Sequence, residues 1–263
     1  MNSPASESLV VLAGAGPGDP GLITLRLQQR LAAADVIITD RLVNPEIITQ
    51  HAKPGVVVVS AGKQGYNDAS YTQDEINQLI VHYAATHRLV LRLKGGDVAF
   101  FSNVLDELQV LHENKIPYEI IPGITAASGA SAFAGIPLTA RGYAQGVQFL
   151  TFNPNSVYTA AQWEALASTN DTLVCYMASR NLGLLVSSLL QYSCSPSKPL
   201  AVVEQATTSQ QTVYISTLGQ AQVEFTTKQF VSPSLVIIGE VVRLHESFKW
   251  FSESDGVSVF KEL

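Results

Sequence analysis

Cysteine, tryptophan and methionine are scarce in this chain, which has two residues of each among its 263. The two cysteines, Cys175 and Cys194, show neither metal-ligand nor redox spacing, which suggests a reducing cytosol. The five histidines include no pair at the i, i+4 spacing that places two metal ligands on one helix face. We therefore expect a cytoplasmic protein whose chemistry requires no metal.

A surplus of positive charge is also missing. Sixteen Lys and Arg residues stand against 22 Asp and Glu, a net charge of −6, and no basic stripe is available for nucleic-acid phosphates. Apolar runs are too short to span a membrane, and the opening residues MNSPASES lack the basic and apolar regions of a signal peptide. We expect neither a nucleic-acid partner nor a membrane partner.

The first half of the chain alternates between strand-like and helix-like patterns. With 46% hydrophobic and 14% charged residues, the chain reads as a compact globular protein. Strands are expected at 9–14, 35–40, 55–60, 88–96 and 118–123, and helices at 25–34, 73–87 and 103–115. This alternation predicts a mainly parallel sheet covered by helices.

The second half has a different pattern, with strands closer together. Strands are expected at 147–152, 171–178, 199–207, 211–217 and 233–242, and helices at 160–168 and 182–192. This order predicts a mixed sheet. Together with the Gly-, Ala- and Pro-rich stretch around residues 122–143, it predicts an α/β domain at 8–122, a second at 123–249 and a tail at 250–263.

A glycine loop, GAGPGDPGLITL, follows the first predicted strand. Gly14, Gly16 and Gly18 follow G-x-G-x-G, whereas a dinucleotide loop needs G-x-G-x-x-G with the helix starting inside the motif. Asp19 stands in place of the third dinucleotide glycine and would repel phosphate, and the two prolines of the loop remove amide donors. We interpret the loop as bringing backbone close to a ligand that is not a polyphosphate.

A dinucleotide-binding loop, a P-loop and a plain surface turn are the alternatives for this segment. Asp40, at the end of the second predicted strand, mimics the ribose-binding acid of a dinucleotide enzyme, but the first plausible helix cap, Thr24, comes late for that fold. A P-loop is excluded because no Gly-Lys-Ser/Thr closes the turn. A plain surface turn would explain the glycines but not the rigid Gly-Pro-Gly-Asp-Pro run.

Two later segments share the same small-residue character. RLKGGDVAFF places Gly95, Gly96 and Asp97 at the end of a buried strand, where open α/β sheets bind ligands, although a hairpin-like turn would look similar. IIPGITAASGASAFAGIPLTARGYA joins prolines with tiny residues and has Thr125 as a possible helix cap. It suits close packing against a flat ligand, or equally an inter-domain linker packed on a helix.

Taken together, these motifs resemble the tetrapyrrole (uroporphyrinogen/precorrin) C-methyltransferases, over nearly the whole chain. The segment DRLV favours the uroporphyrinogen-III branch over later precorrin methylases. The resemblance implies two α/β domains with S-adenosyl-L-methionine in the cleft between them, and a homodimer. It also implies a tetrapyrrole substrate, uroporphyrinogen III, methylated at two pyrrole carbons to give precorrin-2 for siroheme or cobalamin synthesis.

The resemblance also assigns cofactor-binding residues. A sulfonium is cationic, so a lining of carbonyl groups, one carboxylate and apolar side chains suits it better than lysines would. Met177 taken alone would be interpreted as a core methionine. The implied cofactor contacts are Pro17, Gly95, Gly96, Asp97, Phe100, Thr125, Ala126, Met177 and Ala206.

The family's acid–base pair falls on Asp40, as proton acceptor, and Lys63, as proton donor. From the residues alone, Asp40 would be a cap or turn residue and Lys63 a solvated loop lysine. In the implied reaction an enamine-like pyrrole carbon attacks the sulfonium methyl in line, and a proton is then lost.

One departure from the family concerns the substrate. Asn103 stands where relatives usually have arginine, and Asp106 replaces the first glutamate of the same motif. Because the substrate carries eight carboxylates, we assign their binding to Arg41 and Arg141, with Asn103 and Asp106 at the same site. Another precorrin C-methyltransferase and a catalytically impaired tetrapyrrole-binding homologue remain open alternatives.

Overall fold

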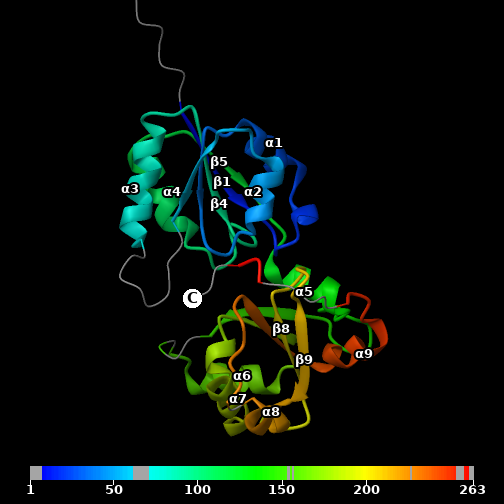
Figure 1. Ribbon diagram of the computed structural model, residues 1–263. Coiled ribbons are helices and arrows are strands. Elements are labelled where there is room, and N and C mark those ends of the chain that lie inside the picture. The colour runs from blue at the N-terminus through cyan, green and yellow to red at the C-terminus, as the bar shows by residue number, and fades with distance from the viewer. Residues whose placement is uncertain are drawn as a thin grey trace, which may run out of the picture. The chain divides into compact units, whose positions relative to one another are not determined.

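The computed structural model describes residues 8–61, 71–152, 155, 157–225, 227–252 and 258–260. These residues form two compact units, each with one five-stranded sheet (Figure 1). Unit 1 comprises the described residues of Met1–Ala126 and Ser258–Leu263, and unit 2 those of Ala127–Val257. The predicted domain limits at residues 122 and 249 stay predictions.

Unit 1 is built on an entirely parallel sheet in the order β3-β2-β4-β1-β5. Its helices cover both faces, α1 and α2 on one and α3 and α4 on the other (Figure 1). This burial on both faces explains the apolar strand runs. The elements are β1 (Leu9–Gly14), α1 (Leu25–Ala33), β2 (Val36–Thr39), α2 (Pro45–His51), β3 (Val57–Ser60), α3 (Gln73–Ala84), β4 (Leu89–Lys94), α4 (Val104–Glu113) and β5 (Tyr118–Ile121).

Side-chain caps determine where the unit 1 helices begin. Thr24 caps α1 as predicted, its Oγ1 accepting the Leu27 N–H at 3.1 Å. Helix α2, which begins after Asn44, was not predicted from the sequence. The Asn44 side chain accepts the Glu46 N–H at 3.0 Å and donates to the Gly18 carbonyl at 2.8 Å. The Asn-Pro pair at 44–45 is a recognisable start signal that could have predicted α2.

Unit 2 has a mixed sheet in the order β6-β7-β10-β8-β9, in which only the β6–β7 pairing is parallel. Helices α6, α7 and α8 pack on one face, and α5 and the 3₁₀ helix η3 on the other. The elements are α5 (Ala126–Ala134), β6 (Val147–Thr151), α6 (Ala160–Ser168), β7 (Thr172–Tyr176), α7 (Leu182–Gln191), β8 (Pro199–Glu204), β9 (Thr212–Thr217), α8 (Leu218–Glu224), β10 (Ser234–Ile238), η3 (Glu240–Leu244) and α9 (His245–Phe248).

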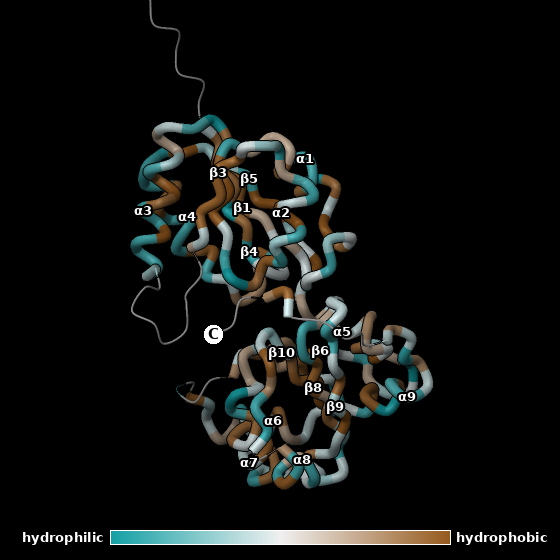
Figure 2. Tube along the Cα trace, viewed as in Figure 1, coloured by the Kyte–Doolittle hydropathy of each residue, from teal (hydrophilic) through white to brown (hydrophobic). Residues whose placement is uncertain are grey.

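Both sheets carry the apolar core of their unit, visible as the brown central strands in Figure 2. Successive residues of β7 enter opposite faces, with Val174 in one core cluster and Leu173 and Cys175 in the other. Cys175 and Cys194 are free and buried. Burial raises the pKa of the Cys175 thiol to about 12, so this thiol is not a nucleophile at neutral pH.

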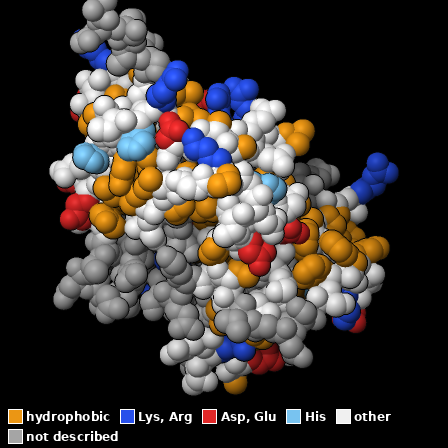
Figure 3. All heavy atoms as spheres, turned by 45° about the horizontal axis from the view of Figure 1, so that its top comes forward, with side chains coloured by type: hydrophobic (Ala, Val, Ile, Leu, Met, Phe, Trp, Pro, Cys, Tyr) orange, Lys and Arg blue, Asp and Glu red, His pale blue; other side chains and the backbone are white. Residues whose placement is uncertain are grey.

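Positive and negative side chains both occur on the face drawn in Figure 3. The surface ion pairs include Arg26–Glu119 at 2.6 Å and Lys53–Asp35 at 2.7 Å. None of the helices within the described residues combines the length and apolar character needed to cross a membrane.

Candidate functional site

The loops at the carboxyl ends of β1, β4 and β5 meet through glycines. Gly16 and Gly96 exchange backbone hydrogen bonds, N–H to carbonyl, at 3.0 and 2.8 Å. A Cβ at Gly14 would stand 2.5 Å from the Gly96 carbonyl oxygen, and one at Gly123 would overlap the same oxygen. Side chains at 14 and 123 would separate these loops, so the glycines bring three backbones to one point. We call this point the glycine junction. The hairpin-like alternative for residues 95–97 is wrong, because Gly96 pairs with Gly16.

Asp97 ties two of these loops together. Its Oδ1 accepts the Ala99 N–H and its Oδ2 accepts the Gly123 N–H, both at 2.8 Å. The residue is buried. The carboxylate predicted to meet a ligand therefore already holds the β4 loop against the β5 loop, and its ligand contact stays a prediction.

Asp40 has the same kind of arrangement after β2. Its Oδ1 accepts the Leu42 N–H at 2.9 Å and its Oδ2 accepts the Gly95 N–H at 3.2 Å. A Cβ at Gly95 would stand 2.7 Å from the Leu42 Cβ, so glycine allows this approach. The turn role considered from the residues alone is present, and the proton-acceptor role stays a prediction. Its predicted partner Lys63 lies outside the described residues.

Beneath these loops lies a buried ionic cluster that the sequence analysis missed. Glu107 Oε1 is 2.9 Å from Arg92 Nε and 2.9 Å from Lys94 Nζ, and the three side chains are at most 5% exposed. Desolvation by burial lowers the pKa of Lys94, and the Glu107 carboxylate opposes that shift. Two cations at alternate positions of an otherwise apolar strand, LVLRLK, were the signal in the sequence.

The loop from β4 to α4 carries several predicted contacts. Phe100 and Phe101 are exposed and meet edge to face, with ring centroids 6.2 Å apart. Asn103 precedes α4 in the left-handed region, at φ 54°, without a side-chain cap bond. Asp106 is exposed in the first turn of α4. Phe101, at φ 51°, is the second non-glycine residue here in a conformation that L side chains rarely adopt.

In unit 2 the predicted contacts follow β7 and β8. Met177 is 57% exposed and has φ 58°, so its interpretation as a core methionine is wrong. Ala206 is buried between Gln205 and Thr207, which have φ 45° and 69°. Arg141 is exposed. Non-glycine residues at positive φ are held there at an energetic cost and cluster at binding sites.

The predicted site residues therefore fall into two groups. In unit 1 the structure joins Asp40 to Gly95 and Asp97 to Gly123, and it brings Gly96 to the glycine junction. Pro17 is buried in the loop after β1, and Arg41 is half-buried beside Asp40. The predicted residues in unit 1 are Pro17, Asp40, Arg41, Gly95, Gly96, Asp97, Phe100, Asn103, Asp106, Thr125 and Ala126, and those in unit 2 are Arg141, Met177 and Ala206.

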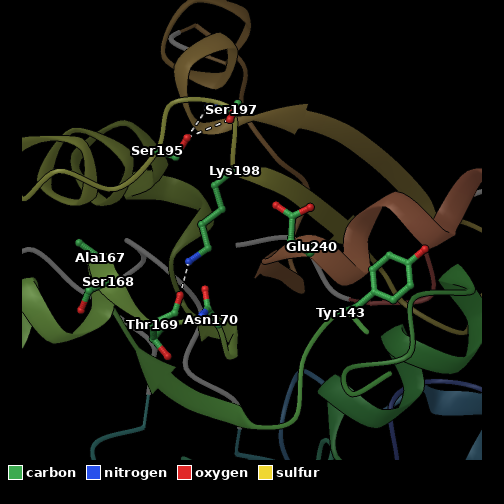
Figure 4. Close-up of a pocket in the computed structure, with 9 residues that line it drawn as sticks. All are labelled: Tyr143, Ala167, Ser168, Thr169, Asn170, Ser195, Ser197, Lys198 and Glu240. Carbon is green, nitrogen blue, oxygen red and sulfur yellow. Dashed lines mark hydrogen bonds between the residues drawn. The ribbon is translucent and has the colours of Figure 1, made fainter. Parts of the chain in front are cut away.

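A polar hollow of about 240 Å³ lies elsewhere in unit 2 (Figure 4). It sits at the amino ends of β7 and β8, opposite the ends that carry Met177 and Ala206. Lys198 Nζ donates to the Thr169 carbonyl there at 2.7 Å. None of the predicted site residues that the structure describes lines this hollow. Within the described residues, no group of three His, Cys, Asp or Glu side chains is placed to hold a metal ion.

The fold and the site define a two-sheet α/β protein whose first unit presents backbone-lined, glycine-built loops rather than a phosphate loop. The family model of the tetrapyrrole (corrin/porphyrin) methylases matches residues 9–222. The chain belongs to this family, and its two units match the two-domain fold of tetrapyrrole methylases.

Sequence relatives include siroheme synthases. Siroheme synthase 2 of Aeromonas hydrophila subsp. hydrophila is 43% identical over 244 residues, covering 93% of this chain and 51% of the relative. The siroheme synthase of Thioalkalivibrio sulfidiphilus is 42% identical over 242 residues, covering 92% and 49%. The chain thus spans about half the length of the curated relatives it matches.

Among solved structures, a uroporphyrin-III C-methyltransferase from Thermus thermophilus complexed with S-adenosyl homocysteine is 32% identical. It has a TM-score of 0.75, and the match covers 90% of this chain and 94% of that one. A cobalt precorrin-4 methyltransferase, 23% identical with a TM-score of 0.78, shares the fold.

Proposed function

We propose that this chain is an S-adenosyl-L-methionine-dependent C-methyltransferase that converts uroporphyrinogen III to precorrin-2 by methylating two pyrrole carbons. Family membership supports this proposal, as do the Thermus thermophilus methyltransferase and the siroheme synthase relatives. The glycine junction is the observation that carries it. It is built from backbone groups rather than charged side chains, which suits a cofactor with a cationic sulfonium.

The residues present fit this cofactor. At Gly96 an added Cβ would meet only the Ala126 nitrogen, at 3.7 Å, so one side of the junction is open. When bound, the cofactor supplies an electrophilic methyl group on sulfur. The backbone of the β4 loop and the exposed side chains of Phe100 and Met177 offer carbonyl and apolar contacts. The residues that would hold it are Pro17, Gly95, Gly96, Asp97, Phe100, Thr125, Ala126, Met177 and Ala206.

Asp40 is the proposed proton acceptor. The amides of Leu42 and Gly95 fix its carboxylate, and each oxygen keeps a lone pair for another donor. The proton leaving the methylated pyrrole carbon passes to this carboxylate, a step that contributes about 10²–10⁴-fold when the base is well placed. Lys63 is proposed as the donor.

The proposed substrate contacts are Arg41, Arg141, Asn103 and Asp106. Arginine binds a carboxylate through two parallel N–H···O bonds, which suits a macrocycle with eight carboxylates. The chain is further proposed to act in the cytoplasm as a homodimer. Light scattering coupled to gel filtration measures the oligomeric state, and a mass of one chain would contradict the dimer.

The decisive experiment uses methyl-labelled cofactor and uroporphyrinogen III, with mass spectrometry to count transferred methyl groups. Two methyls are expected, and a reaction without uroporphyrinogen III is the control for self-methylation. Methylation only of a later precorrin would identify another precorrin C-methyltransferase. Binding of the tetrapyrrole with no transfer to any precorrin would identify an impaired homologue.

Cofactor selectivity is tested separately by calorimetry. S-adenosylhomocysteine is expected to bind and NAD is not, because the loop after β1 lacks a dinucleotide loop's third glycine. Binding of NAD without binding of S-adenosylhomocysteine would contradict the proposed cofactor.

A further inference from the structure

The loop of residues 95–103 carries five of the proposed contacts, yet it includes two strained residues. Phe101 and Asn103 have φ 51° and 54°. Such conformations persist only when the surrounding structure determines them. Within the loop, Asp97 accepts the Ala99 and Gly123 N–H groups, and Val98 is buried. The two ends of the loop are held as well.

The two ends are joined by a buried ion pair. Lys94 is the last residue of β4, and Glu107 lies in the first turns of α4. The Lys94 Nζ to Glu107 Oε1 distance is 2.9 Å, and the side chains are 5% and 0% exposed. Such a pair attracts more strongly than a surface pair because water does not screen it. It therefore closes the base of the loop.

The charge count shows that Lys94 is not needed to neutralise Glu107. Arg92 Nε lies 2.9 Å from the same carboxylate oxygen and would neutralise it alone. Lys94, the second buried cation, is instead next to the loop in the chain. The charge of Asp40 also acts on Lys94, and Asp40 accepts the N–H of Gly95, the next residue along the chain. Lys94 thus links the start of α4 to the Asp40 turn.

We propose that Lys94 and Glu107 are positioning residues that clamp the 95–103 loop, and so place both its cofactor-facing glycines and its substrate-facing end. This role in ligand binding rests on the proposed function, and the restraint on the loop does not. Both side chains are buried, at 5% and 0% exposed. The clamp acts through the Gly95 N–H bond to Asp40 and the Gly96–Gly16 pair.

The chain offers a matched pair of variants. Lys94→Met and Arg92→Met each remove one buried cation and leave a one-to-one ion pair with Glu107. We expect both to lower the melting temperature. Only Lys94→Met is expected to speed amide exchange at Gly95 and Gly96, by at least about tenfold, and to weaken S-adenosylhomocysteine binding by a similar factor. Lys94→Arg keeps the charge, so its amide exchange and its S-adenosylhomocysteine affinity are expected to stay close to those of the unmodified protein. Should Lys94→Met fail to fold, Lys94→Gln keeps a hydrogen-bond donor to Glu107.

Hydrogen exchange followed by mass spectrometry decides the clamp without any assay of activity. Unchanged exchange in folded Lys94→Met, or equal changes in the Arg92→Met control, would overturn the proposal. Failure of the unmodified protein to bind S-adenosylhomocysteine or to methylate uroporphyrinogen III would instead overturn the proposed function, and the exchange result would still decide the clamp.

Discussion

The two units differ in the residues of the loops that carry the predicted site residues. In unit 1 the positive-φ residues next to the ends of β1 and β4 are Gly16 and Gly96, and Phe101 and Asn103 follow later in the β4 loop. In unit 2 the corresponding turns use Met177, Gln205 and Thr207. Glycine adopts these angles without strain, whereas other residues do so at a cost. The glycine junction of unit 1 thus needs close backbones, whereas the turns after β7 and β8 of unit 2 have non-glycine residues at positive φ.

The two units hold their loops partly in the same way. Unit 1 uses carboxylates that accept backbone N–H groups across the glycine junction, from Asp40 and Asp97. In unit 2, Glu204 accepts the Val231 N–H at 2.7 Å and Gln211 accepts the Thr207 N–H at 2.8 Å, both as buried side chains. Both units thus use side-chain oxygens as acceptors for loop N–H groups, and unit 1 adds the backbone contacts of the glycine junction.

The largest expected effect comes from adding one methyl group in unit 1. Gly123→Ala places a Cβ against the Gly96 carbonyl and should lower the free energy of unfolding by about 3 kcal/mol. In unit 2, Gly183→Ala should raise it by about 0.5 kcal/mol, because Gly183 is exposed in α7 with no atom within 4 Å of an added Cβ. Urea unfolding measures both. Equal effects would refute the contrast between the units.

The proposed substrate arginines lie one in each unit. Arg41→Ala and Arg141→Ala each leave a substrate carboxylate without a charged partner. A hydrogen bond to a charged group contributes about 1.5–3 kcal/mol. Tetrapyrrole affinity should fall by roughly one to two orders of magnitude, with little change in S-adenosylhomocysteine affinity. Fluorescence titration with the tetrapyrrole measures the first and calorimetry the second.

Asn103→Arg is the reverse test of the substrate site. It restores the arginine usual in relatives and should tighten tetrapyrrole binding. If Asn103→Arg has no effect and both alanine variants keep full activity, the placement of the substrate site is wrong.

Met177 tests whether unit 2 keeps a strained turn for its side chain. Met177→Gly relieves positive φ but adds backbone freedom, so the free energy of unfolding should change by less than about 1 kcal/mol. S-adenosylhomocysteine affinity should fall about tenfold because an apolar contact is lost. Leu184→Ala, another exposed apolar site in unit 2, is the control and should leave affinity unchanged. Unchanged affinity in Met177→Gly would remove this residue from the site.

The smallest effect concerns the pH dependence of unit 2. Burial raises the pKa of Glu204, opposed by the Val231 N–H and by the charge of Lys228. Between the ordinary glutamate pKa of 4.5 and the raised pKa, the folded state binds more protons than the unfolded state, so stability falls as pH rises through that window. Glu204→Gln should flatten this decline. Thermal melts from pH 4 to 8 measure it, and an unchanged slope would exclude Glu204 as its source.

Several features of the fold were predictable because their causes are local. Short apolar runs predicted β1, β4 and β7, and Thr24 predicted the start of α1. The glycine loop after β1 was predicted to bring backbone close to a ligand that is not a polyphosphate, and that ligand contact stays a prediction. The short helices α2 and α8 were missed because their few residues carry too little periodic signal.

The sequence by itself determined the α/β class, the family and the glycines that permit close backbone contact. These follow from apolar runs and motifs that each span only a short stretch of residues. Only the tertiary structure decided what those groups meet. Asp97 reaches the Gly123 amide, 26 residues away, because β4 and β5 both flank β1. Likewise Glu107 becomes the partner of Arg92 and Lys94 only when α4 packs on the sheet that contains β4. Strand order and helix packing are long-range properties, and no short stretch of residues encodes them.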